Sequence, residues 1–198
     1  LAVKPFAEVF VLYVSFDSHL KNKWLDFTYE VDEGIPTARI YYKKVITGIE
    51  IIDRPVKLLL FLIGFIKGFN FVKNEFGRPQ LVHVHVLLRT GLMALFIKWI
   101  YGIKYVITEH WTGYLPENNV FERKDLKWIT RLVAKNAASI TTVSHDLREA
   151  MLCHGLYNEY EVIYNVVNTS LFRPAQKQGN EIKTMVHVSE FNEQAKNI

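Results

Sequence analysis

The sequence predicts an α/β protein built on one doubly wound parallel sheet with helices on both faces, and three observations support this. From Pro79 onward, strand-like and helix-like runs alternate over short connections. The strand-like runs are apolar almost throughout, as is typical of parallel strands covered on both faces. Four successive runs end in a polar or titratable residue, and ligands of such folds bind at the carboxyl ends of the strands.

The first half of the chain is expected to hold two strands and a long helix. Residues 9–15 and 37–44 are apolar runs rich in β-branched and aromatic residues, and Gly34 and Pro36 mark the start of the second. Residues 56–73 read as a mostly buried helix. Its longest apolar run, 56–66, is too short to span a bilayer, which needs about 20 apolar residues.

The second half supplies the alternating elements. Thr90 and Gly102 are suitable cap and stop residues for the first of its helices. The second helix is amphipathic, because Ile129, Leu132 and Val133 share one face with Leu126. The expected strands are 79–86, 104–110, 139–144 and 160–166, and the expected helices are 90–102, 122–137 and 145–155.

Composition limits the possible partners and compartment. With 198 residues, 49% of them hydrophobic, the chain suits one α/β domain or one domain and part of another. The net charge of +4 permits an anionic ligand or an anionic membrane surface. No basic run with interleaved aromatics follows a nucleic-acid module, so we expect no nucleic-acid partner. The single cysteine, Cys153, is expected to be a small buried hydrophobe, and a cytoplasmic location is expected, with peripheral membrane contact as an alternative.

The expected strand ends gather candidate ligand residues at one edge of the sheet. Two histidines lie two apart, His83 and His85, and so share a face of their strand. Either could instead be a satisfied core histidine, and no Cys, Asp or Glu lies at a metal-ligand spacing, so no metal site is predicted. The candidates for substrate contact are His85, Glu109, His110, Trp111, Ser144 and Asn165.

The loop "TEHWTGY" is the most informative of these strand ends. His110 could donate to a ligand oxygen while Trp111 covers a sugar face; alternatively, the tryptophan packs down on the sheet. Ser144 is a preferred N-cap in its own right, without a full capping box because Leu147 lies three residues on. Asn165 could simply bond within its own turn.

Four segments together resemble the family-four glycosyltransferases, which are retaining enzymes of the GT-B fold. "TEHWTGY" is similar to the strand-end His loop of that family, and "SITTVSHDLRE" to its following strand and helix. "VIYNVVNTSLFRP" is similar to the end of its first domain, although Tyr164 and Val166 replace the usual Pro and Gly, and Asn168 the usual Asp. "KTMVHVSEFNEQAKNI" is similar to the opening of its second domain.

The resemblance implies a division of the chain and a function. Residues 1–174 would be the acceptor-side, Rossmann-like half of a GT-B fold whose first strand precedes Leu1. Residues 175–198 would be a linker and the first strand of the donor-binding domain. The full-length enzyme would move a sugar from a nucleoside diphosphate sugar to a glycan, lipid or small hydroxyl acceptor, without a metal or cofactor. His110 and Glu109 would be the catalytic residues.

Two further functions stay open. A nucleotide-sugar epimerase of the same fold would need strand-end carboxylates as acid and base, and Glu109 is the one obvious candidate. A non-catalytic domain that binds glycan or protein is the other. If the transferase interpretation holds, the 198-residue chain alone is expected to be inactive, because catalysis needs donor and acceptor held together. The donor, the acceptor and the oligomeric state do not follow from the sequence.

Overall fold

The computed structural model divides the chain into two compact units. One unit comprises Leu1–Val82 and Phe96–Lys104, and the other comprises His83–Leu95 and Tyr105–Ile198. The structure describes residues 5–20, 22–44, 48–118, 121, 124–171 and 173.

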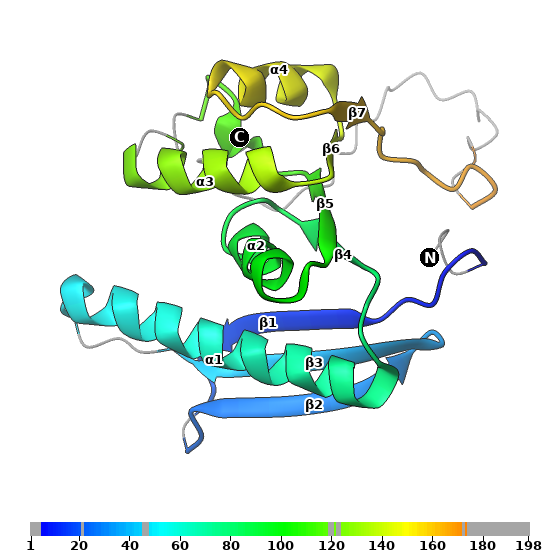
Figure 1. Cartoon of the computed structure of the whole chain (residues 1–198). Helices are drawn as coiled ribbons and strands as arrows, with labels where there is room; N and C mark the ends of the chain where they lie inside the picture. Colours follow the sequence, from blue (N-terminus) through cyan, green and yellow to red (C-terminus); the bar gives the residue numbers. More distant parts are fainter. Residues whose placement is uncertain are drawn as a thin grey trace, which may run out of the picture. The chain divides into compact units, whose positions relative to one another are not determined.

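A three-stranded sheet forms the first unit, with strand order β1–β3–β2 (Figure 1). β1 (Val11–Asp17) runs parallel to β3 (Ile35–Lys43), whereas β2 (Leu25–Asp32) is antiparallel to β3. Glu33 and Gly34, both with positive φ (48° and 75°), form the two-residue turn between β2 and β3. This is the backbone of the hairpin turn that matches strand twist, and neither this hairpin turn nor β2 was predicted from the sequence.

α1 (Glu50–Phe76) packs on the sheet through Gly64 and Gly68. An added Cβ at Gly64 would lie 3.2 Å from Ile40 and 3.3 Å from Val14, so the helix axis approaches the strands closely there. The helix begins at Glu50 instead of residue 56, with Pro55 inside it. The expectation of a mostly buried helix is wrong for one face, where apolar side chains are exposed: Ile51 by 86%, Leu59 by 56% and Ile66 by 58%.

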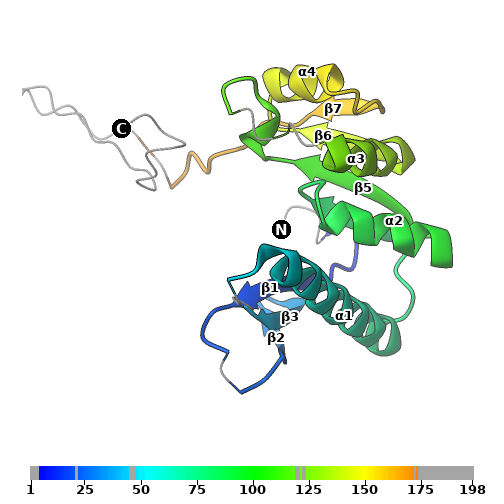
Figure 2. The same ribbon diagram turned by 90° about the vertical axis from the view of Figure 1, so that its left-hand side faces the viewer.

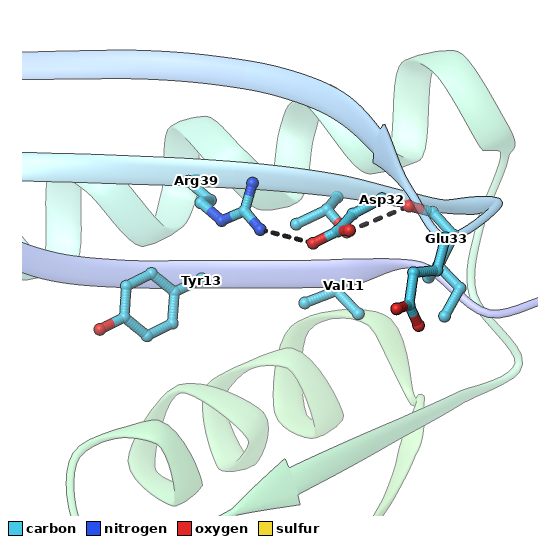
Figure 3. A pocket seen from close by; sticks show the side chains of 7 residues that line it. Val11, Tyr13, Asp32, Glu33 and Arg39 are labelled. Atoms are coloured by element: carbon cyan, nitrogen blue, oxygen red, sulfur yellow. Dashed lines mark hydrogen bonds and ion pairs between the residues drawn. The ribbon is translucent and has the colours of Figure 1, made fainter. Parts of the chain in front are cut away.

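The sheet face away from Ile40 carries a charged cluster on β2 and β3. Arg39 forms an ion pair with Asp32 at 3.0 Å and another with Glu30, and Figure 3 shows the guanidinium reaching toward the Asp32 carboxylate. Both acids are more than half exposed, so these pairs contribute little to stability. The cluster borders a hollow of about 480 Å³ lined by Val11, Tyr13, Asp32, Glu33, Ile35, Thr37 and Arg39.

A four-stranded sheet, order β4–β5–β6–β7, carries the predicted alternation. Figure 2 shows β5, β6 and β7 of this sheet side by side. β6 is parallel to both β5 and β7. Tyr105 on β5 donates its hydroxyl proton to the carbonyl of Val133 on α3 at 2.6 Å, which fixes this helix against the sheet. The strands are Leu81–His85, Lys104–Glu109, Ser139–Thr142 and Tyr160–Val162, and the helices α2, α3 and α4 are Thr90–Tyr101, Lys124–Asn136 and His145–Cys153.

The predicted parallel sheet flanked by helices is confirmed in these four strands. The expectation that the earlier strands join the same parallel sheet is wrong, because β1–β3 form a separate sheet with an antiparallel pair. Cys153 is exposed, not buried as expected. The predicted domain boundary after residue 174 and the strand expected beyond it lie outside the described residues.

Candidate functional site

Glu109, the last residue of β5, is a fully buried carboxylate (0% exposed) that binds three backbone N–H groups. Its Oε1 accepts from the N–H of His110 at 2.9 Å and of Trp111 at 2.8 Å. Its Oε2 accepts from the N–H of Leu87 at 2.9 Å. The carboxylate therefore ties the loop after β5 to the loop after β4.

Burial dominates the electrostatics around Glu109. Burial raises the pKa of Glu109, while the three backbone N–H groups and the nearby His110 lower it in part. The pKa values of Tyr114 and Tyr160 are raised first by burial and then by the Glu109 charge, so both phenols stay neutral. The surroundings of this carboxylate thus include backbone N–H donors and the neutral phenols of Tyr114 and Tyr160.

The loop after β4, whose Leu87 N–H binds Glu109, contains an unusual backbone conformation. Val86 has φ 68°, a left-handed value that is an outlier for a β-branched residue and costs about 1–3 kcal/mol. Its N–H donates to the Thr108 carbonyl at 3.0 Å, and its own carbonyl accepts from the Thr90 hydroxyl at 2.6 Å. These bonds, together with the one from Leu87 to Glu109, hold the turn in place.

The loops after β4 and β5 bring two histidine rings together. His85 Nδ1 and His110 Nε2 form a hydrogen bond of 3.3 Å, and the ring planes are parallel within 4° with centres 5.6 Å apart. Because imidazole nitrogens bond within the ring plane, the two rings meet edge to edge. The strand-end prediction that His85 and His110 lie at one edge agrees with this geometry, although no observation here tests their roles.

His83 and His85 are exposed, so the alternative of core histidines is wrong for both. Their ring centres lie 4.5 Å apart on one face of β4. The pKa of His83 is lowered by partial burial and then by the neighbouring His85 and His110 charges, and that of His85 by partial burial and His110. A charge on His110 therefore disfavours protonation of His83 and of His85.

A hydrogen-bonded row crosses the same sheet and was missed from the sequence. His83 Nε2 bonds to Thr108 Oγ1 at 2.7 Å, and Thr108 Oγ1 to Thr141 Oγ1 at 2.7 Å. The register of β5 and β6 pairs these two threonines directly. The spacing of these residues was the available signal. His83 and His85 lie two apart, as do Thr108 and His110, and residues two apart on a strand share one face of the sheet.

Trp111 is half-buried and packs within its own loop, with its ring centre 5.1 Å from that of the buried Tyr114. The alternative expectation was that the indole packs down on the sheet, whereas this contact is to a residue of its own loop, and sugar contact by its open side stays a prediction. The short helix η1 (Thr112–Tyr114) continues the loop, and the Tyr114 carbonyl bonds to His154 Nε2 of α4's C-terminal end at 2.9 Å.

The remaining candidates lie at the ends of β6 and β7. Ser144 is the N-cap of α4, as predicted, because its hydroxyl oxygen accepts from the Leu147 N–H at 3.2 Å. Asn165 is exposed in the segment after β7, and its neighbour Tyr164 contacts the ring of His145 with centres 6.1 Å apart. Among the described residues, no hydrogen bond or ring contact joins Ser144 or Asn165 to His110. Their predicted roles in substrate binding stay predictions.

Within the described ranges, no three His, Cys, Asp or Glu side chains are grouped so that they could hold a metal ion. The expectation that the activity needs no metal or cofactor stays a prediction.

The protein is thus an α/β protein with a parallel sheet, and titratable side chains lie at the carboxyl ends of the strands, where ligands of such folds bind. The model of the family described as Glycosyltransferase Family 4 matches residues 9–171, and the chain belongs to this family. The family predicted from the sequence is thereby confirmed. A search of the curated proteins finds no significant match.

Among solved structures, the chain is similar to sucrose-phosphate synthase from Thermosynechococcus elongatus, with a TM-score of 0.55 and 16% sequence identity. The similarity covers 83% of this chain and 40% of that one, so the chain spans less than half the length of the structure it matches. At this identity the similarity shows the fold.

Proposed function

We propose that the full-length gene product transfers a sugar from a nucleoside diphosphate sugar to a hydroxyl acceptor, with retention of the anomeric configuration, and that this chain supplies the acceptor-side part of the site. The observation that carries the proposal is His110, which lies at the end of a parallel strand, fixed by Glu109 and His85, inside the segment that matches the glycosyltransferase family. A fixed hydrogen-bond donor is suited to stabilise charge that develops on a reacting sugar.

The other strand ends complete the proposed site. Trp111 would cover a sugar face, and Ser144 and Asn165 would line the same edge. His85 would lie within the cleft beside His110, to which it is bonded. We propose that the reaction uses no cofactor. The nucleoside diphosphate sugar is a substrate, and its nucleoside diphosphate is the leaving group.

The state of Glu109 favours a transferase over an epimerase of the same fold. An epimerase needs an acid and a base that reach the sugar ring, whereas the two oxygens of Glu109 face backbone N–H groups and the side chain is buried. We propose that Glu109 contributes to catalysis through the loop it holds.

Titration of the full-length gene product with a panel of nucleoside diphosphate sugars and oligosaccharides tests the proposal. We expect a donor to bind and nucleoside diphosphate to be released when an acceptor hydroxyl is present. A changed sugar that stays attached to its nucleotide would support the epimerase, and glycan binding without donor binding would support the binding domain. The 198-residue chain by itself is expected to release no nucleoside diphosphate, because it spans 40% of the structure it matches.

The exposed face of α1 motivates a membrane-contact proposal. Among the described residues, one helix, Ile51–Phe76, is long and apolar enough to cross a membrane by length and composition alone, a test that core helices also pass. Its exposed stripe of Ile51, Leu59 and Ile66 accompanies Lys57 and Lys67 on the same helix, so the helix could lie on an anionic surface.

Co-sedimentation with vesicles checks this proposal. We expect binding to increase with the fraction of anionic lipid, and the exposed change Ile66→Asp to weaken it several-fold. Asn74→Asp, an exposed position on the same helix, is the matched control for added charge. Binding that does not depend on anionic lipid content would remove the proposal.

A further inference from the structure

We infer that Glu109 and His85 are positioning residues which together fix both the main chain and the ring of His110, so that Nδ1 is the ring nitrogen that His110 presents to a sugar hydroxyl. The role of this arrangement in sugar transfer rests on the proposed function. The arrangement itself is a property of the folded chain that can be measured without any substrate.

The main chain of His110 is fixed by the buried carboxylate. Glu109 accepts the N–H of His110 and of Trp111 with one oxygen and the N–H of Leu87 with the other. Hydrogen bonds to a charged group in a water-excluded site are about twice as strong as neutral ones. A displacement of the His110 loop would therefore have to break bonds to a carboxylate that has no access to water.

The turn at Val86 directs two successive backbone N–H groups toward fixed acceptors. Because Val86 adopts φ 68°, successive N–H groups of Val86 and Leu87 point at the Thr108 carbonyl and at Glu109. The strained turn keeps its shape as long as both acceptors are in place. Glu109 thus couples the backbone that follows His85 to the backbone that carries His110.

The ring of His110 is fixed by His85. A neutral imidazole has one donor nitrogen and one acceptor nitrogen, and the Nε2 of His110 is engaged by His85 Nδ1 at 3.3 Å. No bond to His110 Nδ1 is present among the described residues, so Nδ1 is the nitrogen left for a ligand. For Nδ1 to donate to a sugar oxygen, His110 must be the Nδ1–H tautomer, with His85 donating from its own Nδ1.

Nitrogen-15 NMR on the 198-residue chain tests this assignment directly. Free histidine favours the Nε2–H tautomer, so we expect the unmodified chain to show His110 as Nδ1–H at a pH where both rings are neutral. In His85→Phe, which keeps a ring at that position but no nitrogen, we expect His110 to revert to Nε2–H. His110 found as Nε2–H in the unmodified chain would overturn the tautomer assignment, with no variant needed.

Glu109→Gln tests the main-chain part. A glutamine amide offers one oxygen and one NH₂ group, so either the His110 side or the Leu87 side must lose its acceptor and face a donor. We expect amide exchange at the affected N–H groups to become about tenfold faster or more. Glu161→Gln, an exposed carboxylate on β7, is the matched control. Exchange at Leu87, His110 and Trp111 that is equal in the two variants would overturn the inference.

Turnover separates positioning from a merely structural role. In the full-length gene product, Glu109→Gln is expected to lower kcat with KM little changed, because the binding surface stays while the donor is misaligned. If the NMR results are as expected but no donor in the panel reacts, the positioning inference holds and the proposed function fails. A Glu109→Gln enzyme with unchanged kcat would contradict the positioning role.

Discussion

His110→Ala in the full-length gene product is expected to lower turnover by about 10²–10³, the usual loss when one fixed donor to a developing charge is removed. His110 has the geometry of such a donor, since its main chain is bound to Glu109 and its ring to His85. Thermal stability should change little, because the side chain is exposed. The measurement is the steady-state rate with a donor on which the unmodified protein is active.

His19→Ala is the matched control for this prediction. His19 is also exposed, its backbone N–H donates to the Oδ1 of Asp17 at 2.7 Å, and it belongs to the first unit, whereas His110 belongs to the second. Its replacement should leave turnover unchanged. His83→Ala should have a modest effect on both stability and turnover, since His83 is exposed but bonds to Thr108. Near-normal turnover in His110→Ala would rule out the role assigned to this ring.

Gly68→Val is expected to destabilise the first unit by about 1–3 kcal/mol or more, the usual cost of overpacking a well-packed core. An added Cβ at Gly68 would lie 2.8 Å from the Cδ1 of Ile40 and would also collide with a methyl group of Leu12. Ile40 is fully buried at the centre of the sheet and cannot retreat into solvent. The change in the urea concentration at the midpoint of unfolding measures the effect.

At Gly68, helix propensity alone would predict that valine raises stability, so a loss of stability would have to come from packing. Glycine is the poorest helix former apart from proline, so its replacement by valine at an exposed position is favourable. Asparagine and valine have similar helix propensities, so Asn70→Val on the exposed side of α1 should leave stability almost unchanged. Equal midpoints for Gly68→Val and Asn70→Val would show that α1 does not pack on the sheet through its glycines.

The second half of the fold could be predicted from the sequence because its signals are local. Apolar runs, caps and glycine stops predicted β4–β6 and α2–α4 with boundaries close to the observed ones, whereas β7 ends at Val162 and not at residue 166 as expected. β2 was not predicted, although "LDFTYEVD" alternates apolar and polar residues with the period of a half-exposed strand, so the sequence did carry a signal for it. The exposed face of α1 was not predicted either, since an apolar run does not reveal which of its sides is covered.

The candidate site was partly predictable for a similar reason. Because parallel strand ends meet at one edge, sequence position alone brought His85, Glu109 and His110 into one group. The burial of Glu109 and its three N–H partners depend on the course of two loops, and the left-handed Val86 has no sequence signal because β-branched residues rarely adopt it. The Thr108–Thr141 bond depends on strand register, which a strand pattern does not give.

Proton NMR of the reaction, with the full-length gene product, a nucleoside diphosphate sugar and an acceptor, tests the central claim most directly. The account predicts a new anomeric signal with the same configuration as the donor, together with release of nucleoside diphosphate, and loss of both by about 10²–10³ in His110→Ala. A product of inverted configuration would contradict the retaining assignment. A sugar altered while still attached to its nucleotide would contradict the assignment as a glycosyltransferase.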